Sequence, residues 1–514
     1  MFLSQLPSLK STLRSDSEKD FNVGANKLLA AKSTHGKNYN VDEAFTRQVW
    51  KGVVDIAERH NDPGKFTTFA GYEYSSSGLH RNVIYSGSPD DTLKTIPFSR
   101  FDSDNPEDLW DYLEKYREQT GSGVISIPHN SNLSRGSMFK TITYEGKKIS
   151  LNYIQTRASI EPLVEITQIK GDSETHPLIS PNDEFADYEK HGAFGSQGSL
   201  SETKRITEYC EKYYAGLPQG VPSDPKIEAY CKRPRGSSSK EKTSDTQEMI
   251  QGSYVRSALQ RGLNIQALIG ANPYKFGVIG ATDTHTGIAT VDEDNYWGKM
   301  AMNEPSPYRA NTQSHYSAQG YAAVWATENT REAIFAAMER REVYATTGPR
   351  ITLRFFGGWD YLSAEADTPD LAQVGYSRGV PMGGDIKSSG GGKNLKFLMQ
   401  ASKDPDGLGI ETLQLIKGWI DSAGAMRTSV IPVISEKKGA DSLCKVFSDS
   451  DFDRSLSSYY YMRVIEPESR RWHTFECDRI PSEQRPPVCS DGTYSSSIRA
   501  VSYTHLTLPT SDLV

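Results

Sequence analysis

The stretch GVIGATDTHTGIAT, residues 277–290, decides how the fold is interpreted: an apolar run ends at a glycine and then presents Asp283 and His285 two residues apart. On extended chain, side chains at positions i and i+2 point to the same side, so this pair can share or bridge metal ions. An isolated Asp-x-His at a turn is more often a local cap or hydrogen bond. The metal interpretation therefore depends on whether other ligands converge on the same place.

The chain around this stretch alternates strand-like apolar runs with amphipathic helix-like runs from residue 47 to residue 348. Such alternation is typical of a parallel α/β architecture. Asn105 is a good helix cap and Pro106 suits the first helical position, which together predict where one helix begins. The predicted helices are 49–62, 105–121, 253–270 and 330–348, and the predicted strands are 66–76, 124–131, 161–168 and 273–283.

From residue 349 to residue 500 the pattern changes to β-like runs separated by clusters of Gly, Ser and Asp. This pattern predicts a β-rich, sandwich-like second domain. Residues 1–46 are predicted to be a polar connecting segment, and residues 232–244 a polar loop.

The composition of the 514-residue chain limits its partners. The formal net charge is −7 and no basic face is evident, which argues against nucleic acid as the main partner. No apolar run approaches the ~20 residues that span a bilayer, so we expect neither a transmembrane helix nor a membrane partner. A small-molecule substrate is the expected partner, and the oligomeric state is not predicted.

The five cysteines lack the CxxC spacing of a structural zinc site. Cys210 with Cys231, and Cys477 with Cys489, can form disulfides in an exported protein. Unpaired thiols are the equal alternative, and the odd number leaves one cysteine over in either case.

Polar side chains gather after four predicted strands, where barrel and doubly wound folds place their active sites. Glu73 follows the first of these strands, His129 the second, and Asp283 with His285 the last. The segment LHRNVIY, residues 79–85, is the predicted return strand of a hairpin. Carboxylates and imidazoles are ligands that zinc, manganese or iron accept, so the sequence predicts a metal centre. The third strand is followed by Glu165, Lys170, Asp172, Glu174 and His176.

Other catalytic schemes lack their motifs. No G-x-S-x-G elbow follows a strand, so a Ser-His-Asp hydrolase is not expected. No G-x-G-x-x-G opens a helix after a strand, and no G-x-x-x-x-G-K-[ST] is present, so nucleotide-cofactor chemistry has no support.

Several blocks between about residue 47 and residue 500 carry a family resemblance: GYEYSSSGLHRNVIYSG, SIPHNSNLS, EPLVEITQIKGDSETHP, FGVIGATDTHTG and REVYATTGPRITLRFFGGW. They closely resemble the DUF3604 proteins, which are similar to the carbaryl-hydrolase-like branch of the PHP (polymerase and histidinol phosphatase) metallohydrolase superfamily. The resemblance implies a distorted (β/α)7 barrel. It also implies two or three divalent metals (zinc, manganese or iron) that activate a water for hydrolysis of an ester, phosphoester or carbamate.

The resemblance also implies four metal ligands. Glu73 matches the bridging glutamate of the superfamily, and His129 matches its mid-chain histidine ligand. Asp283 and His285 match its closing Asp-x-His.

Four further residues are candidates for other roles. His80 matches a site histidine on the strand after the glutamate, and the predicted hairpin brings it and Arg81 beside Glu73. His176 lies in a family block, and we place it with His80 in the catalytic set. Arg81 and Lys170 can hold an anionic group of a substrate, with a surface position as the equal alternative.

The sequence departs from the superfamily in its first part. PHP proteins open with an H-x-H strand and a T-D-H, and this sequence has no H-x-H and no T-D-H before residue 283. We therefore expect an incomplete barrel that lacks its first strands, and a chain that is weakly active or inactive. The compartment is not predicted, because an export signal would lie in the part expected to be missing.

Two further expectations concern the last part of the chain. VSYTHLTLPTSDLV, residues 501–514, resembles translated sequencing adapter and is excluded from the fold as a non-native tail. The alternative function is a non-catalytic ligand-binding protein in which the aromatic side chains of RFFGGWDYL and KGWI recognise the ligand.

Overall fold

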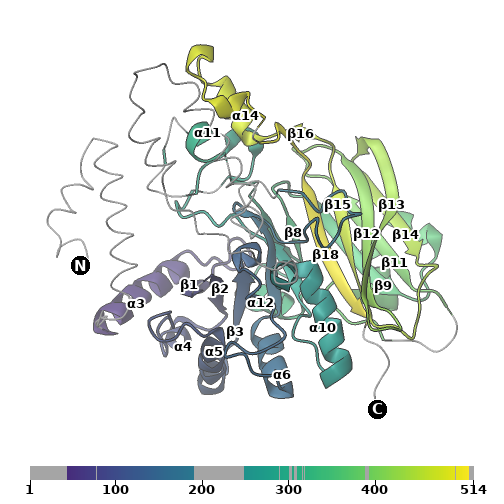
Figure 1. Ribbon diagram of the computed structural model, residues 1–514. Helices are drawn as coiled ribbons and strands as arrows, with labels where there is room; N and C mark the ends of the chain where they lie inside the picture. The colour runs from purple at the N-terminus through teal and green to yellow at the C-terminus, as the bar shows by residue number, and fades with distance from the viewer. Residues whose placement is uncertain are drawn as a thin grey trace.

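The computed structural model describes residues 43–76, 78–189, 248–288, 290–299, 304–305, 309–314, 316–317, 319–387, 393–492 and 494–508. The predictions for residues 1–42, Cys210, Cys231, the loop 232–244 and residues 509–514 lie outside these ranges. A part rich in helices lies beside a part built of long strands (Figure 1). The predicted mixed α/β class is confirmed.

The first sheet has the strand order β1 (Ala70–Ser76), β2 (Leu79–Tyr85) and β3 (Val124–His129). Because successive side chains point to opposite faces of a strand, the sheet has two distinct faces. One face carries Tyr74, Val83 and Val124, which are buried against apolar residues of three helices. These helices are α3 (Glu43–Arg59), α5 (Pro106–Thr120) and α6 (Leu151–Ile160).

The predicted start of α5 is confirmed. Asn105 lies at the cap position, and its side-chain oxygen accepts a hydrogen bond from the backbone N–H of Glu107 at 2.9 Å. Pro106 follows at the first helical position, where its missing N–H costs nothing.

The predicted hairpin of β1 and β2 is confirmed, but β2 also pairs antiparallel with β3, which differs from the parallel architecture predicted for this part of the chain. β1 ends at Ser76 and β2 begins at Leu79, and so short a connection permits only antiparallel strands. A parallel pair does occur in the second sheet, between β4 (Leu163–Gln168) and β6 (Gly277–Gly280), with β5 (Gly171–Asp172) on the other side of β4. Within the described ranges the strands form separate sheets and no closed barrel.

Apolar residues join the first two sheets. Ile125 and Ile127 of β3 pack with Leu163 of β4, and Phe335 and Val343 complete this core. The helix α10 (Val255–Ile269) covers the second sheet and is buried along most of its length.

The predicted helix 330–348 is wrong in its second half. The helix α12 spans Arg331–Glu339, and Val343–Thr346 form the strand β8. Arg341 adopts the left-handed conformation, with φ of 64°, which a continuing helix does not allow. Val, Tyr and Thr in the last four residues favour a strand.

The C-terminal part is β-rich, as predicted. One sheet has the order β10 (Gly379–Pro381), β9 (Thr352–Gly358), β11 (Lys396–Ser402) and β14 (Ser442–Ser448). The other has the order β13 (Met426–Ala440), β12 (Ile410–Ile420), β15 (Ser458–Ile465), β18 (Val501–Leu508), β8 and β7 (Tyr321–Val324). Apolar side chains of both sheets share one core, including Phe355, Phe397, Leu415 and Met462.

The prediction that residues 501–514 lie outside the fold is wrong for residues 501–508. Val501–Leu508 form β18, which lies between β15 and β8 and pairs with β15 along its whole length. The side chains of residues 501–505 are all buried. Val, Tyr and Thr in this segment suit a central strand, which accounts for its place in the sheet.

Shorter elements complete the described chain. A disulfide joins Cys477 to Cys489, one of the two pairings considered possible, and Cys444 is a free thiol. Among the helices that the structure describes, none combines the length and the hydropathy that a membrane crossing needs. The short elements are α4 (Pro89–Thr92), α11 (Arg309–Thr312), α13 (Leu371–Arg378), α14 (Trp472–Asp478), β16 (Ser469–Arg470), β17 (Ser497–Ile498) and the 3-10 helices 131–133, 293–295, 363–367, 482–484 and 487–489.

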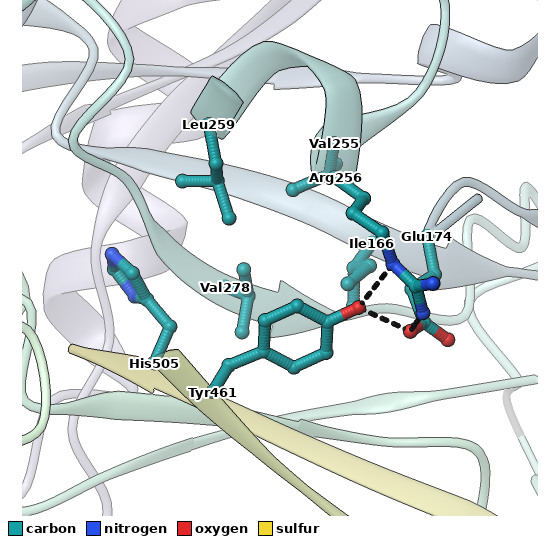
Figure 2. Close-up of a pocket in the computed structure, with 8 residues that line it drawn as sticks. All are labelled: Ile166, Glu174, Val255, Arg256, Leu259, Val278, Tyr461 and His505. Atoms are coloured by element: carbon teal, nitrogen blue, oxygen red, sulfur yellow. Dashed lines mark hydrogen bonds and ion pairs between the residues drawn. The ribbon is translucent and has the colours of Figure 1, made fainter. Parts of the chain in front are cut away.

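A buried charge network joins the helix-rich part to the C-terminal sheets. Arg256 of α10 donates to Tyr461 Oη at 2.7 Å, and Tyr461 donates to Glu174 (Figure 2). Arg256 also donates to Asp183 at 2.6 Å. Arg463 of β15 lies 3.0 Å from Glu174 and 2.7 Å from Asp183. Two guanidinium groups thus meet two carboxylates. The cavity beside them is about 10 Å³, room for no more than one water molecule.

We expect the substitution Glu174→Gln to lower the free energy of unfolding by about 3–5 kcal/mol, since it leaves buried guanidinium charge without its partner. Urea denaturation followed by circular dichroism measures this loss.

The matched control is Asp55→Asn, which removes the exposed ion pair between Lys51 and Asp55. This control should cost less than about 1 kcal/mol. Equal losses of the free energy of unfolding for the two variants would show that the buried network stabilises the protein no more than an exposed ion pair does.

Candidate metal centre

Glu73, His80 and His129 lie on the face of the first sheet that α3 and α5 leave uncovered. His80 of β2 is paired with His129 of β3 on one side and with Ser75 of β1 on the other. Glu73 is two residues before Ser75, so its side chain points to the same face. The predicted hairpin therefore does bring His80 beside Glu73.

Both imidazole rings direct a nitrogen to one carboxylate oxygen. His80 Nδ1 lies 2.7 Å, and His129 Nε2 3.2 Å, from Glu73 Oε1. One ligand atom from each of the three residues lies within 4.8 Å of the others. The side chains of Glu73 and His80 are 34% and 31% exposed, whereas that of His129 is 2% exposed. The cluster is thus anchored in the protein through His129 and accessible to solvent through the other two.

The electrostatics of the cluster suit metal ligation. Burial raises the pKa of Glu73, but hydrogen bonds from His129 and then His80 outweigh burial and hold that pKa well below its ordinary value. Burial lowers the pKa of His129, and Glu73 offsets part of this effect. At neutral pH the cluster presents an ionised carboxylate and a neutral imidazole, the forms in which these side chains bind metals.

The donor set therefore fits a divalent metal ion. Two imidazoles and one carboxylate are a known ligand set for zinc sites that keep a further position for water or substrate. One feature fits less well: His129 Nδ1 is buried and has no hydrogen-bond partner among the described residues. A ligating histidine usually donates its second N–H to an outer partner.

Asp283 and His285 lie next to each other but bind lysines in this structure. Lys170 Nζ contacts Asp283 Oδ2, and Lys299 Nζ lies 2.6 Å from the same oxygen. His285 Nδ1 lies 3.2 Å from Lys299 Nζ. The charge of the Asp283 carboxylate also acts on the ligand cluster, because it raises the pKa of His129 and so opposes part of the effect of burial. The roles of Asp283 and His285 as metal ligands stay predictions.

Lys299 is a site residue that sequence reasoning missed. Its side chain is 3% exposed, and burial lowers its pKa to about 8, with Asp283 opposing and Lys170 adding to the shift. The backbone places it there, because the N–H of His285 donates to the carbonyl oxygen of Lys299 at 2.7 Å. No sequence motif surrounds Lys299, so only the tertiary pairing reveals it.

Arg81 does not lie where the sequence places it. Arg81 follows His80 directly, so it points to the opposite face of β2, where it pairs with Glu161 at 2.6 Å. The predicted position of Arg81 beside Glu73 is therefore wrong, whereas a role in binding a substrate stays a prediction. His176 accepts a hydrogen bond from the N–H of Leu178 and packs against Tyr254. The assignment of His176 to the catalytic set stays a prediction.

Glu165, at the middle of β4, is a further buried titratable group near the site. Burial, and after it the Asp283 carboxylate, raise the pKa of Glu165 to about 8. The N–H of Asn130 donates to Glu165 Oε1 at 3.3 Å. The Glu165 carboxyl group therefore carries a proton at neutral pH.

Comparison with known proteins gives one match. The family model described as "Protein of unknown function (DUF3604)" matches residues 5–229, 228–437 and 431–501. No curated protein and no solved structure matches the chain. The comparison covers nearly the whole length of the chain and adds no activity.

Glu165 is expected to make stability pH-dependent. Between its ordinary pKa of 4.5 and about 8, the folded protein holds a proton that the unfolded chain has lost. The contribution of this group to the free energy of unfolding is thus fully present below pH 4.5 and is lost as the pH rises through about 8. The free energy of unfolding of the wild type should fall between about pH 5 and pH 8.5. In Glu165→Gln this fall should be smaller by at least about 1 kcal/mol.

Urea denaturation at several pH values in the presence of a chelator measures the effect. The control is Glu332→Gln, at an exposed position of α12. An unchanged pH dependence in Glu165→Gln would contradict the assignment of a buried proton to this group.

Proposed function

The chain belongs to the DUF3604 family, and we propose that it is a metal-dependent hydrolase of a small ester, phosphoester or carbamate. The observation that carries the proposal is the convergence of Glu73, His80 and His129 on one point. The resemblance of the surrounding sequence blocks to PHP metallohydrolases supports the same chemistry. That resemblance also supports the proposal that the sheets β1-β2-β3 and β5-β4-β6 belong to a PHP-type barrel.

The three clustered residues would hold the metal ion. When bound, a divalent ion acts as a Lewis acid and brings the pKa of a bound water near ~7, which provides a nucleophile at neutral pH. His129 gives the cluster a fixed position, because it is buried at the end of β3. Glu73 and His80, being partly exposed, leave the approach open to a substrate.

The lysine pair favours a substrate with an anionic group. Two ammonium groups share the single carboxylate of Asp283, so positive charge remains in excess beside the ligand cluster. Both lysines bind Asp283 Oδ2, so an ion held through this oxygen would displace Lys170 and Lys299, which would then be free to bind the substrate. Lys170 thus keeps its proposed role, and Lys299 joins it.

One prediction of the hydrolase proposal concerns metal content. Purified protein is expected to bind zinc or manganese, and Glu73→Gln should weaken binding at least about tenfold, since even loss of an outer partner costs about 10–100-fold. Inductively coupled plasma mass spectrometry and titration against a chelating dye measure stoichiometry and affinity.

The control is His60→Ala, which removes an exposed histidine next to the end of α3. The substitution Glu73→Gln preserves shape at a partly exposed position and should leave the fold intact. Equal metal binding by wild type and Glu73→Gln would remove the basis of the proposal. A protein without metal that still binds small molecules would favour the non-catalytic alternative.

The second prediction concerns turnover. With three clustered ligands, we expect weak hydrolysis of p-nitrophenyl phosphate or p-nitrophenyl acetate, dependent on added manganese or zinc. Lys170→Met should raise KM for the phosphate more than for the acetate, because it removes a charge that only the anionic substrate uses.

Chelation and Glu73→Gln should each abolish this turnover, and Lys51→Met, at an exposed position of α3, should not affect it. Hydrolysis that persists in Glu73→Gln would show that another group catalyses it.

A further inference from the structure

A second polar cavity lies on the opposite face of the first sheet from the metal centre. Its volume is about 390 Å³, within the range of small-molecule sites. It is bounded by β2, by the first turns of α5, by α6 and by the loop 137–144. Arg81 lines it and His80 does not, since neighbouring residues of a strand face opposite ways.

Two buried guanidinium groups in this wall share one buried carboxylate. Arg81 Nε lies 2.6 Å from Glu161 Oε1, and Arg157 Nε lies 3.1 Å from Glu161 Oε2. Trp110 Nε1 also donates to Glu161 Oε1, at 2.8 Å. The side chains of Arg81, Arg157 and Glu161 are 1%, 3% and 0% exposed. One positive charge is therefore left over from this group of three.

Both arginines pair with Glu161, and Arg81 is the less completely hydrogen-bonded of the two. The other nitrogens of Arg157 are used, because they donate to the Met138 carbonyl oxygen at 2.9 Å and to Tyr274 Oη at 3.2 Å. Arg81 Nη1, in contrast, is buried and has no hydrogen-bond partner among the described residues. A buried charged group with an unmet donor is costly, so an anion that accepts from it would be strongly favoured.

The rest of the wall indicates what kind of anion fits. Trp110 and Tyr153 pack edge to face, with ring centroids 5.3 Å apart, and offer an aromatic surface. Lys140 adds a positive charge, whereas Glu107, whose carboxylate accepts from the N–H of Tyr144, adds a negative one. A ligand with a single negative charge meets this balance better than a dianion.

We propose that this cavity binds a small monocarboxylate with an aromatic or apolar body. Its carboxylate lies at the wall to which Arg81, Arg157 and Lys140 give a positive charge, and its body packs on Trp110 and Tyr153. The site is separate from the metal centre and does not depend on the hydrolase proposal.

The probe is 4-fluorobenzoate, added to the full chain and followed by ¹⁹F NMR. We expect a Kd of about 1 mM or tighter, and at least about tenfold weaker binding of the neutral 4-fluorobenzyl alcohol. Arg81→Met should weaken 4-fluorobenzoate binding at least about tenfold, whereas Arg81→Lys should retain part of it.

Because Arg81 is buried, a second variant keeps the test independent of folding. Ile142 is 40% exposed at the cavity, and Ile142→Glu should repel the anion and weaken binding at least about tenfold. The charge-matched control is Ile56→Glu on α3, at a position 54% exposed, which should bind as the wild type does.

The variant Glu73→Gln should also bind 4-fluorobenzoate normally, which separates this site from the metal centre. Absence of binding by the wild type, or binding that Ile142→Glu leaves unchanged, would overturn the proposal. Binding that is lost in Glu73→Gln would place the carboxylate at the metal centre instead.

Discussion

The register of β2 between β1 and β3 is the constraint on which both polar sites depend. His80 meets Glu73 and His129 on one face, and Arg81 meets Glu161 on the other. A shift of the register by one residue would exchange the two faces, since side chains alternate with a period of two. His80 would then lie among the aromatic residues of α3 and α5, on the opposite face from Glu73 and His129. The short connection from β1 and the apolar residues Leu79 and Val83 hold the register in place.

Buried charges in this protein occur in two kinds of group. Around Glu174 and Asp183, two carboxylates meet two arginines, and the charge is balanced. Around Asp283 and around Glu161, a single carboxylate meets two cations. Balanced charges can be satisfied by the protein alone. A group with one cation in excess favours an incoming anion, and the two groups of this kind lie at the two places where we infer binding.

The sequence predicts what depends on neighbours along the chain. The Asn105 cap, the hairpin that returns to His80 and the strand that ends at His129 are local features, and the structure confirms them. The helix 330–348 was mispredicted because helix-forming residues run into β8 without a Gly or Pro between them. Lys299 and Glu161 acquire their roles from partners far away in sequence, so no local pattern indicates them. The position of Arg81, by contrast, follows from strand alternation alone and was within reach of sequence reasoning.

The sheet that contains β18 determines how the chain can be divided. β7 and β8 come before residue 348 and pair with each other, yet β8 also pairs with β18, and β18 pairs with β15. Arg463 reaches back 289 residues to Glu174. The sequence pattern changes between residues 348 and 349. A cut there would leave the N-terminal piece with β8 unpaired at one edge. The C-terminal piece would keep buried arginines without their acidic partners. The two parts therefore form one cooperative unit, which neither expression as separate halves nor exchange of one half between relatives would preserve.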